Sequence, residues 1–215
     1  MITLTTVKGA AADLGHHQPV AIPPSDPLPA PPGGSLKGRV LVAVPGMYDA
    51  NFDRTVVLVL EHGEDGAVGV VLNRPSDAEV SAAVPGWGAV AAPPAVVFVG
   101  GPVVPQGALA LGEVSDPDVA EGWTAVLGSV GLVDLGRAVE SAPPGVERAR
   151  LFAGHAGWGP GQLEGEISAG GWFVVDGEPG DAFAPRPAEL WRVVLARQRG
   201  RLAWFANCPP DPSSN

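Results

Sequence analysis

Four polar or aromatic side chains that lie close together in the sequence could form a small pocket. They are His155, Trp158, Gln162 and Glu166. Gln162 and Glu166 are four residues apart, so they share one face of a helix expected from about 160 to 169. Free amides at the start of that helix could bind an anion. A glycine-rich corner with Trp158 in the core and Gln162 bonded to neighbouring backbone explains the same residues without a ligand.

Two further segments carry candidate binding residues. They are Asn73-Arg74, at the end of an expected hairpin, and Gly100-Gly101, at the end of an expected strand. Arg74 could hold an anion with both guanidinium arms, or it could pair with a carboxylate such as Asp49 or Asp53. The two glycines could expose amides to a ligand, or they could only form a forced turn. No Gly-Lys-Ser/Thr follows them, which excludes a P-loop.

The sequence offers no catalytic constellation. His62 and His155 are the histidines of the expected folded body, and no Gly-x-Ser-x-Gly elbow is present. Glu164 and Glu166 are two apart on a helix, so they do not form an acid–base pair. Cys208 lies in a proline-rich ending, a poor setting for a nucleophile. We therefore predict no catalytic residues, no metal ligands and no cofactor, and whether the protein is an enzyme stays open.

Charge and composition restrict the partners and the compartment. The 215 residues carry a net charge of −10, which argues against a nucleic-acid backbone or an anionic membrane as a partner. Arginines near the last expected helix, among them Arg192 and Arg199, fit a charged solvent face. One cysteine excludes an internal disulfide. No signal peptide or membrane-length apolar run is visible, so a cytoplasmic location is expected.

The elements that must position the candidate residues follow from apolar runs and breakers. Strands are expected at 37–44, 55–61, 67–73, 95–99, 109–114, 123–127, 147–153 and 171–176, with hairpins over 55–73 and between 95–99 and 109–114. Helices are expected after a capping box at Ser76–Glu79, after Asp134, at the Gly154–Glu166 corner and over 187–199. The pattern predicts a single α+β domain with a largely antiparallel sheet over 37–205. A disordered Pro/Ala-rich tail is expected over 1–36 and a second tail over 206–215.

Four sequence blocks, taken in order, resemble the YqgE/AlgH family of bacterial proteins. The blocks are Asp49-x-x-Phe52-x-Arg54-x-Val56, Gly69–Pro75, Gly100–Val103 and Gly154–Glu166. The resemblance covers about 38–205, and the ending after Leu202 is similar to actinobacterial members. It implies a bifurcated antiparallel sheet curled toward a pseudo-barrel, with a few helices packed outside, in a cytosolic protein. It implies no agreed activity. The chain departs from the family at His155, where a tyrosine is usual.

Three functions remain in competition, in descending order. The first is a non-enzymatic regulatory or protein-interaction module with an unknown protein partner. The second is a small-molecule or nucleotide-binding protein, or an enzyme, with a pocket between the Gly100-Gly101 turn and the Gly154–Glu166 corner. The third is a transcriptional regulator acting on DNA, although direct nucleic-acid binding conflicts with the negative charge. The oligomeric state does not follow from the sequence.

Overall fold

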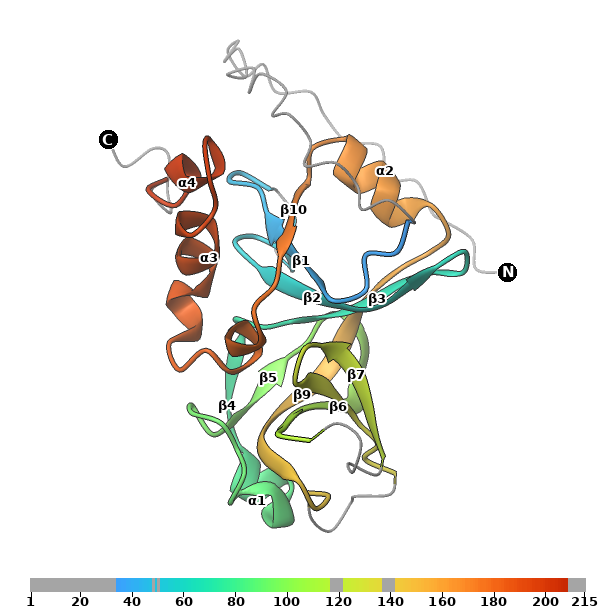
Figure 1. The fold of residues 1–215 in the computed structure, drawn as a ribbon, viewed down its shortest axis with the longest axis vertical. Coiled ribbons are helices and arrows are strands. Elements are labelled where there is room, and N and C mark those ends of the chain that lie inside the picture. The colour runs from blue at the N-terminus through green and yellow to red at the C-terminus, as the bar shows by residue number, and fades with distance from the viewer. Residues whose placement is uncertain (1–33, 48, 50, 117–121, 137–141, 209–215) are drawn as a thin grey trace, which may run out of the picture.

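The computed structural model describes residues 34–47, 49, 51–116, 122–136 and 142–208 (Figure 1). Most of the two expected tails lies outside these residues. Leu36 and Ala206, next to the expected ends of the folded body, are both buried. The boundaries at 36 and 205 remain predictions.

A mostly antiparallel sheet curled into a half-barrel dominates the described residues (Figure 1). Its strand order is β10-β1-β2-β3-β9-β6-β8-β7, with β4 and β5 on a side branch. The branch starts at the long strand β9 (Val146–Trp158), which pairs with β3 at its end and with β6 and β5 before that. The predicted α+β class and the bifurcated, curled sheet are therefore confirmed.

The remaining strands have these bounds: β1 Arg39–Ala43, β2 Val56–Gly63, β3 Gly66–Val71, β4 Pro75–Glu79, β5 Val96–Val99, β6 Val103–Val114, β7 Trp123–Leu127, β8 Val130–Val133 and β10 Trp172–Asp176. The helices are α1 Val80–Ala83, α2 Gln162–Ser168, α3 Pro187–Ala196 and α4 Leu202–Phe205, with 3-10 turns η1 Pro85–Trp87 and η2 Pro179–Phe183. No helix among the described residues is long and apolar enough to cross a membrane.

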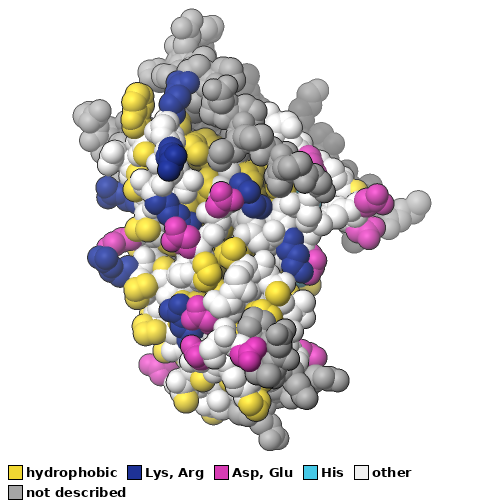
Figure 2. All heavy atoms as spheres, viewed as in Figure 1, with side chains coloured by type: hydrophobic (Ala, Val, Ile, Leu, Met, Phe, Trp, Pro, Cys, Tyr) yellow, Lys and Arg dark blue, Asp and Glu magenta, His cyan; other side chains and the backbone are white. Residues whose placement is uncertain are grey.

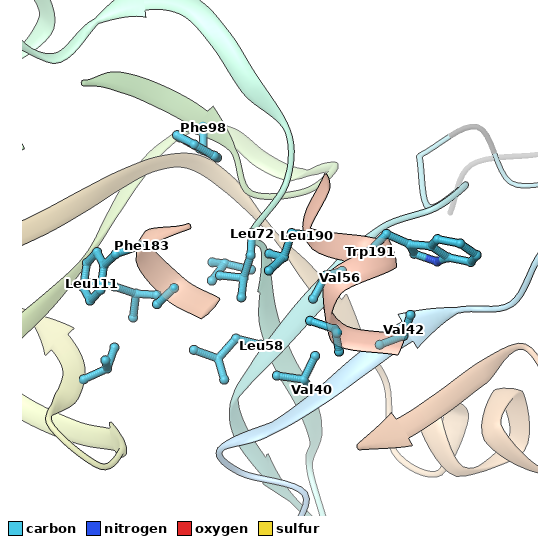
Figure 3. Packing of buried hydrophobic residues seen from close by; sticks show 14 of the residues in the cluster. Val40, Val42, Val56, Leu58, Leu72, Phe98, Leu111, Phe183, Leu190 and Trp191 are labelled. Atoms are coloured by element: carbon cyan, nitrogen blue, oxygen red, sulfur yellow. The ribbon is translucent and has the colours of Figure 1, made fainter. Parts of the chain in front are cut away.

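Strands β1, β2 and β3 are apolar on both faces because both faces are covered. On one face, Leu58 belongs to the cluster that includes Leu190 of α3 (Figure 3). On the other face, Val57 packs in a cluster with Leu163 of α2. Two-sided burial explains why these strands read as continuous apolar runs instead of alternating ones. The predicted 55–73 hairpin is present as β2 and β3.

The helix expected over 187–199 is present as α3, one turn shorter than predicted. Pro187 stands in its first turn, where a missing N–H has no cost. Leu190, Trp191 and Val194 form its buried stripe. The Trp191 Nε1–H donates to the Ala43 carbonyl oxygen at 2.8 Å, which fixes α3 against the end of β1.

The capping-box prediction at Ser76–Glu79 is wrong. These residues form strand β4, paired with β5, and the short helix α1 starts only at Val80. The Ser76 hydroxyl donates to the Val97 carbonyl oxygen at 2.6 Å instead of capping a helix. Pairing with a strand about 20 residues away therefore overrides the local capping signal.

The predicted hairpin between 95–99 and 109–114 is also wrong. Strand β5 pairs antiparallel with β4 and parallel with β9, whereas β6 pairs with β8 and β9. The chain crosses over β9 between β5 and β6, so the two strands lie on opposite sides of it. The helix expected after Asp134 falls mostly outside the described residues; at its start, Asp134 Oδ1 accepts the Gly136 amide in a turn.

A buried arginine joins β9 to two distant loops. Arg150 is 1% exposed and donates to the carbonyl oxygens of Pro93 at 2.6 Å and Ala184 at 3.2 Å. Its guanidinium lies over the Phe98 ring, 4.2 Å from the centroid. Burial, with a smaller contribution from Arg148, lowers the pKa of Arg150 to about 10, so it stays charged at neutral pH.

A second arginine gives a testable acid dependence of stability. Arg148 Nε donates to the Glu113 carboxylate across β6 and β9 and lowers the pKa of Glu113 below its usual 4.5. The unfolded chain then binds more protons in acid, so this stabilisation is complete above the unfolded pKa. It is lost as pH falls through the folded pKa. We expect Glu113→Gln to be less stable than wild type at neutral pH, and this gap to narrow in acid below the usual glutamate pKa of 4.5, in urea unfolding at the two pH values. A gap that is the same at both pH values would contradict this assignment.

Candidate functional site

Three side chains surround the carboxylate of Glu166, on α2. Its Oε2 accepts the indole N–H groups of Trp158 and Trp172, each at 2.9 Å. Its Oε1 accepts the Gln162 side-chain amide, also at 2.9 Å. The helical spacing of four residues brings Gln162 and Glu166 together, as the sequence indicates. We call these four residues the carboxylate clamp, because one carboxylate holds the end of β9, the start of β10 and the start of α2.

The aromatic rings of the clamp are part of the core. Trp158 is 6% exposed and Trp172 is 4% exposed, and their ring centroids lie 6.1 Å apart. Phe52 stacks on Trp158 at 6.3 Å and meets Trp172 edge-on at 5.5 Å. Rings in mutual contact leave no room for a ligand between them, and both Glu166 oxygens are engaged by donors. The geometry therefore favours a structural role for the inward half of the corner.

The start of α2 lies two residues later than expected. Gly161, with φ 70°, precedes the helix, and the Gln162 amide donates to the Gly159 carbonyl oxygen at 3.1 Å. The Gln162 side-chain oxygen in turn accepts the Gly159 amide at 3.1 Å. The backbone N–H of Gln162 was among the groups expected to bind an anion, but it already donates to Gly159.

The Gly100-Gly101 turn is pressed against the backbone of β9. The Gly100 amide donates to the Ala153 carbonyl oxygen at 2.8 Å, so it is not presented to a ligand. A Cβ at Gly100 would come within 2.3 Å of the Gly154 oxygen. At Gly101, where φ is 151°, a Cβ would come within 2.3 Å of the His155 carbonyl carbon. Glycine is required here because two chain segments cross in contact.

Asn73 and Arg74 hold the loop that carries Phe52. Asn73 accepts the Val56 amide at 3.0 Å and donates to the Arg54 carbonyl oxygen at 2.8 Å. Arg74 donates to the carbonyl oxygen of Asp53 at 2.8 Å, so it bonds Asp53 through the backbone instead of the carboxylate. Blocks far apart in the sequence therefore converge: the Asn73-Arg74 block fixes the loop whose Phe52 packs on the clamp.

The outward side of the corner borders an exposed apolar surface. Along β9, Ala156 and Trp158 face inward, whereas His155 is half-buried and Gly157 is exposed. His155 lies opposite Val103, at the start of β6. We define the apolar ridge as Val99, Val103 and Val104, which are 48%, 37% and 55% exposed. Val104 has φ 46°, a conformation that is strained for a β-branched residue.

A second surface near the clamp was not predicted. A shallow hollow of about 330 Å³ lies between the tip of the β2–β3 hairpin and Trp158. His62, at this hollow, bonds through Nε2 to Glu164 Oε1 at 2.8 Å, and its buried Nδ1 has no hydrogen-bond partner within the described part of the chain. The sequence could not predict the contact between His62 and Glu164, because the two residues are 102 positions apart. Among the described residues, no group of three or more His, Cys, Asp or Glu side chains is arranged to hold a metal.

Comparison with known proteins connects this geometry to a family. The sequence model described as AlgH-like matches residues 40–203, most of the chain and all four blocks. The chain belongs to the AlgH-like family. A UPF0301 protein of Streptomyces coelicolor is 51% identical over 185 residues, covering 84% of this chain and 96% of the relative. A UPF0301 protein of Mycobacterium avium is 40% identical over 199 residues, covering 90% and 99%.

Two solved structures support the AlgH-like fold. A crystal structure of a Corynebacterium diphtheriae protein is similar with a TM-score of 0.74 at 36% identity, covering 80% of this chain and 92% of that one. The solution structure of AlgH from Pseudomonas aeruginosa is similar with a TM-score of 0.60 at 27% identity, covering 91% and 98%. The predicted family and its actinobacterial character are confirmed, and neither the family description nor these names specify an activity.

Proposed function

We propose that this AlgH-like protein is a non-enzymatic interaction module that binds a protein partner through the apolar ridge. One observation carries the proposal: Val99, Val103 and Val104 are exposed on either side of the Gly100-Gly101 turn, which packs against the backbone of β9. Grouped apolar side chains on a surface are typical of interaction sites. Backbone strain, as at Val104, is commonly held at functional positions.

The clamp supports this choice over a pocket at the same corner. Both oxygens of Glu166 accept hydrogen bonds from Trp158, Trp172 and Gln162, which favours scaffolding over catalysis. The described hollow lies at the β2–β3 hairpin and is not lined by Gly100 or Gly101. His155 borders the ridge opposite Val103, so the departure from the family's usual tyrosine lies where it can alter partner choice.

Site-specific photo-crosslinking tests the ridge. A photoreactive residue at position 104 is expected to give a discrete protein adduct in an actinobacterial extract, and Val99→Glu in the same chain should reduce it about tenfold. A buried charge at an apolar contact has this effect because it loses its water without gaining a partner. The adduct is measured by mass spectrometry of the purified cross-linked band.

A matched control separates binding from general damage. Ala125, on β7, is also exposed and lies outside the ridge, so Ala125→Glu introduces the same charge at another exposed apolar strand residue. It should leave the adduct unchanged. An adduct that survives Val99→Glu, or equal labelling from exposed Pro144, would refute the ridge as a docking surface.

A cytoplasmic location and a regulatory role are further parts of the proposal. They rest on the family resemblance, and the net charge of −10 disfavours direct nucleic-acid binding. Cell fractionation of the tagged full chain tests the location, and a gel shift at low salt tests DNA binding. A salt-dependent shift would instead support the transcriptional alternative.

A further inference from the structure

The α3–α4 pair presents a surface unlike the rest of the molecule. Trp204, on α4, is 75% exposed, and Val193, on α3, is 49% exposed. The neighbouring Phe205 stacks on Phe173 with ring centroids 5.1 Å apart, which directs Phe205 toward the sheet and leaves Trp204 outside. Arg192 Nε donates to the Ala206 carbonyl oxygen at 3.0 Å and ties the two helices together. An indole that is exposed to solvent on two helices held together offers a surface for contact with a partner.

Exposed arginines directly precede α4, the helix that carries this indole. Arg199 and Arg201 are exposed and make no ion pair with any described residue. The neighbouring arginines differ: Arg186 pairs with Glu189, and Arg197 is held by Asp181. We define the C-terminal basic face by residues on and between these two helices: Arg192, Val193, Arg199, Arg201 and Trp204.

The charge of this face is opposite to that of the chain. The five residues of the face include three arginines and no acidic residue, a formal +3, within a protein of net charge −10. Figure 2 shows the dark blue side chains spread along the edge where Figure 1 places α3 and α4. Exposed guanidinium groups are suited to carboxylates, which they bind with two parallel hydrogen bonds.

We propose that the C-terminal basic face binds a short acidic segment of a partner protein, with apolar residues between its carboxylates. Carboxylates pair with Arg199 and Arg201, and an apolar side chain packs on Trp204. A short acidic segment fits because it is small enough to contact this face alone. A long polyanion would also meet the acidic remainder of the surface. The chain's own residues 1–33 supply two side-chain carboxylates, Asp13 and Asp26, and residues 209–215 supply one, Asp211, whereas a segment of another protein can carry several in close sequence.

A peptide array tests the proposal directly on the full-length protein. The probes are twelve-residue peptides in which glutamate alternates with leucine or phenylalanine, and the control array carries glutamine in place of glutamate. We expect saturable binding to the acidic array, at least about tenfold weaker binding to the glutamine array, and protection of Trp204 from acrylamide quenching. Trp204→Ala and the double variant Arg199→Gln with Arg201→Gln should each weaken binding about tenfold.

Controls separate this surface from the apolar ridge and from other classes of ligand. Val99→Glu, which disables the ridge, should leave peptide binding unchanged, so the two proposals succeed or fail separately. No saturable binding to any acidic peptide, or binding unaffected by the Arg199/Arg201 variant, would overturn the proposal. Tighter binding of oligo-dT or anionic vesicles than of the peptides would overturn it in favour of those ligands. Concentration-dependent sedimentation lost in the same variant would instead assign the face to a second copy of the chain.

Discussion

Glu166→Ala is expected to lower the free energy of unfolding by about 3 kcal/mol, because it leaves two largely buried indole N–H groups without an acceptor. Trp158 and Trp172 both donate to this one carboxylate at 2.9 Å. For a chain of this size the loss corresponds to roughly 6–12 °C in Tm. Urea unfolding followed by tryptophan fluorescence measures it.

Two variants on the same helix make the Glu166 result specific. Glu166→Gln keeps one oxygen as an acceptor for the two indoles, but it places its NH2 group against the NH2 group of Gln162. We therefore expect about half of the loss in unfolding free energy that Glu166→Ala causes. Ser168→Ala, at an exposed position of α2, should change stability by less than about 0.5 kcal/mol. If Glu166→Ala proved no more destabilising than Ser168→Ala, the clamp would not be a structural element.

Asp181→Ala is expected to cost about 4 kcal/mol, because it leaves a partly buried arginine without its carboxylate. Asp181 is 5% exposed, and its two oxygens accept both terminal nitrogens of Arg197. One oxygen also accepts the Glu178 amide at 2.9 Å, which closes the η2 turn. The carboxylate of Asp181 raises the pKa of Arg197, so this guanidinium stays charged at neutral pH.

The neighbouring Glu178 provides the control for Asp181. It approaches Arg197 at 3.4 Å but is 67% exposed, and Glu178→Gln should therefore cost less than about 1 kcal/mol. Thermal unfolding of the two variants side by side measures the difference. Equal losses would show that burial of Asp181 contributes nothing to the strength of this pair.

The sequence predicts the core elements well because local patterns of apolar residues indicate which side chains are buried. The valine-rich runs of β1 to β3 and the 3–4 spacing of Leu190, Trp191 and Val194 each identify an element without knowledge of its partners. The Ser76–Glu79 segment shows the limit. Its local capping signal was overridden by pairing with β5, and such a long-range choice leaves no trace in four residues.

The candidate corner could be predicted in part for the same reason. The face shared by Gln162 and Glu166 follows from helical geometry, and the Gln162–Glu166 hydrogen bond has that origin. The second indole, Trp172, and the packing of Phe52 depend on how three segments meet in space. The exposure of the ridge could not be predicted either, since Val99 reads as an ordinary strand residue and Val103 lies beyond the expected strand at 95–99.

The two sides of strand β9 have different roles. The inward side of the Gly154–Glu166 corner builds the clamp, and the outward side borders the ridge through His155. A substitution that affected both sides of the corner could not distinguish the two roles. Glu166 belongs only to the clamp and Val99 only to the ridge, so variants at these two positions test the roles one at a time. The separation is a consequence of strand geometry, because successive side chains of β9 point to opposite faces.

The most direct test measures stability and partner cross-linking together in Glu166→Ala and Val99→Glu. The account predicts that Glu166→Ala lowers the free energy of unfolding by about 3 kcal/mol yet retains the position-104 adduct under conditions where the variant is folded. Val99→Glu should change stability by less than about 0.5 kcal/mol and lose the adduct. Loss of the adduct in the folded Glu166→Ala variant, with retention in Val99→Glu, would contradict the account.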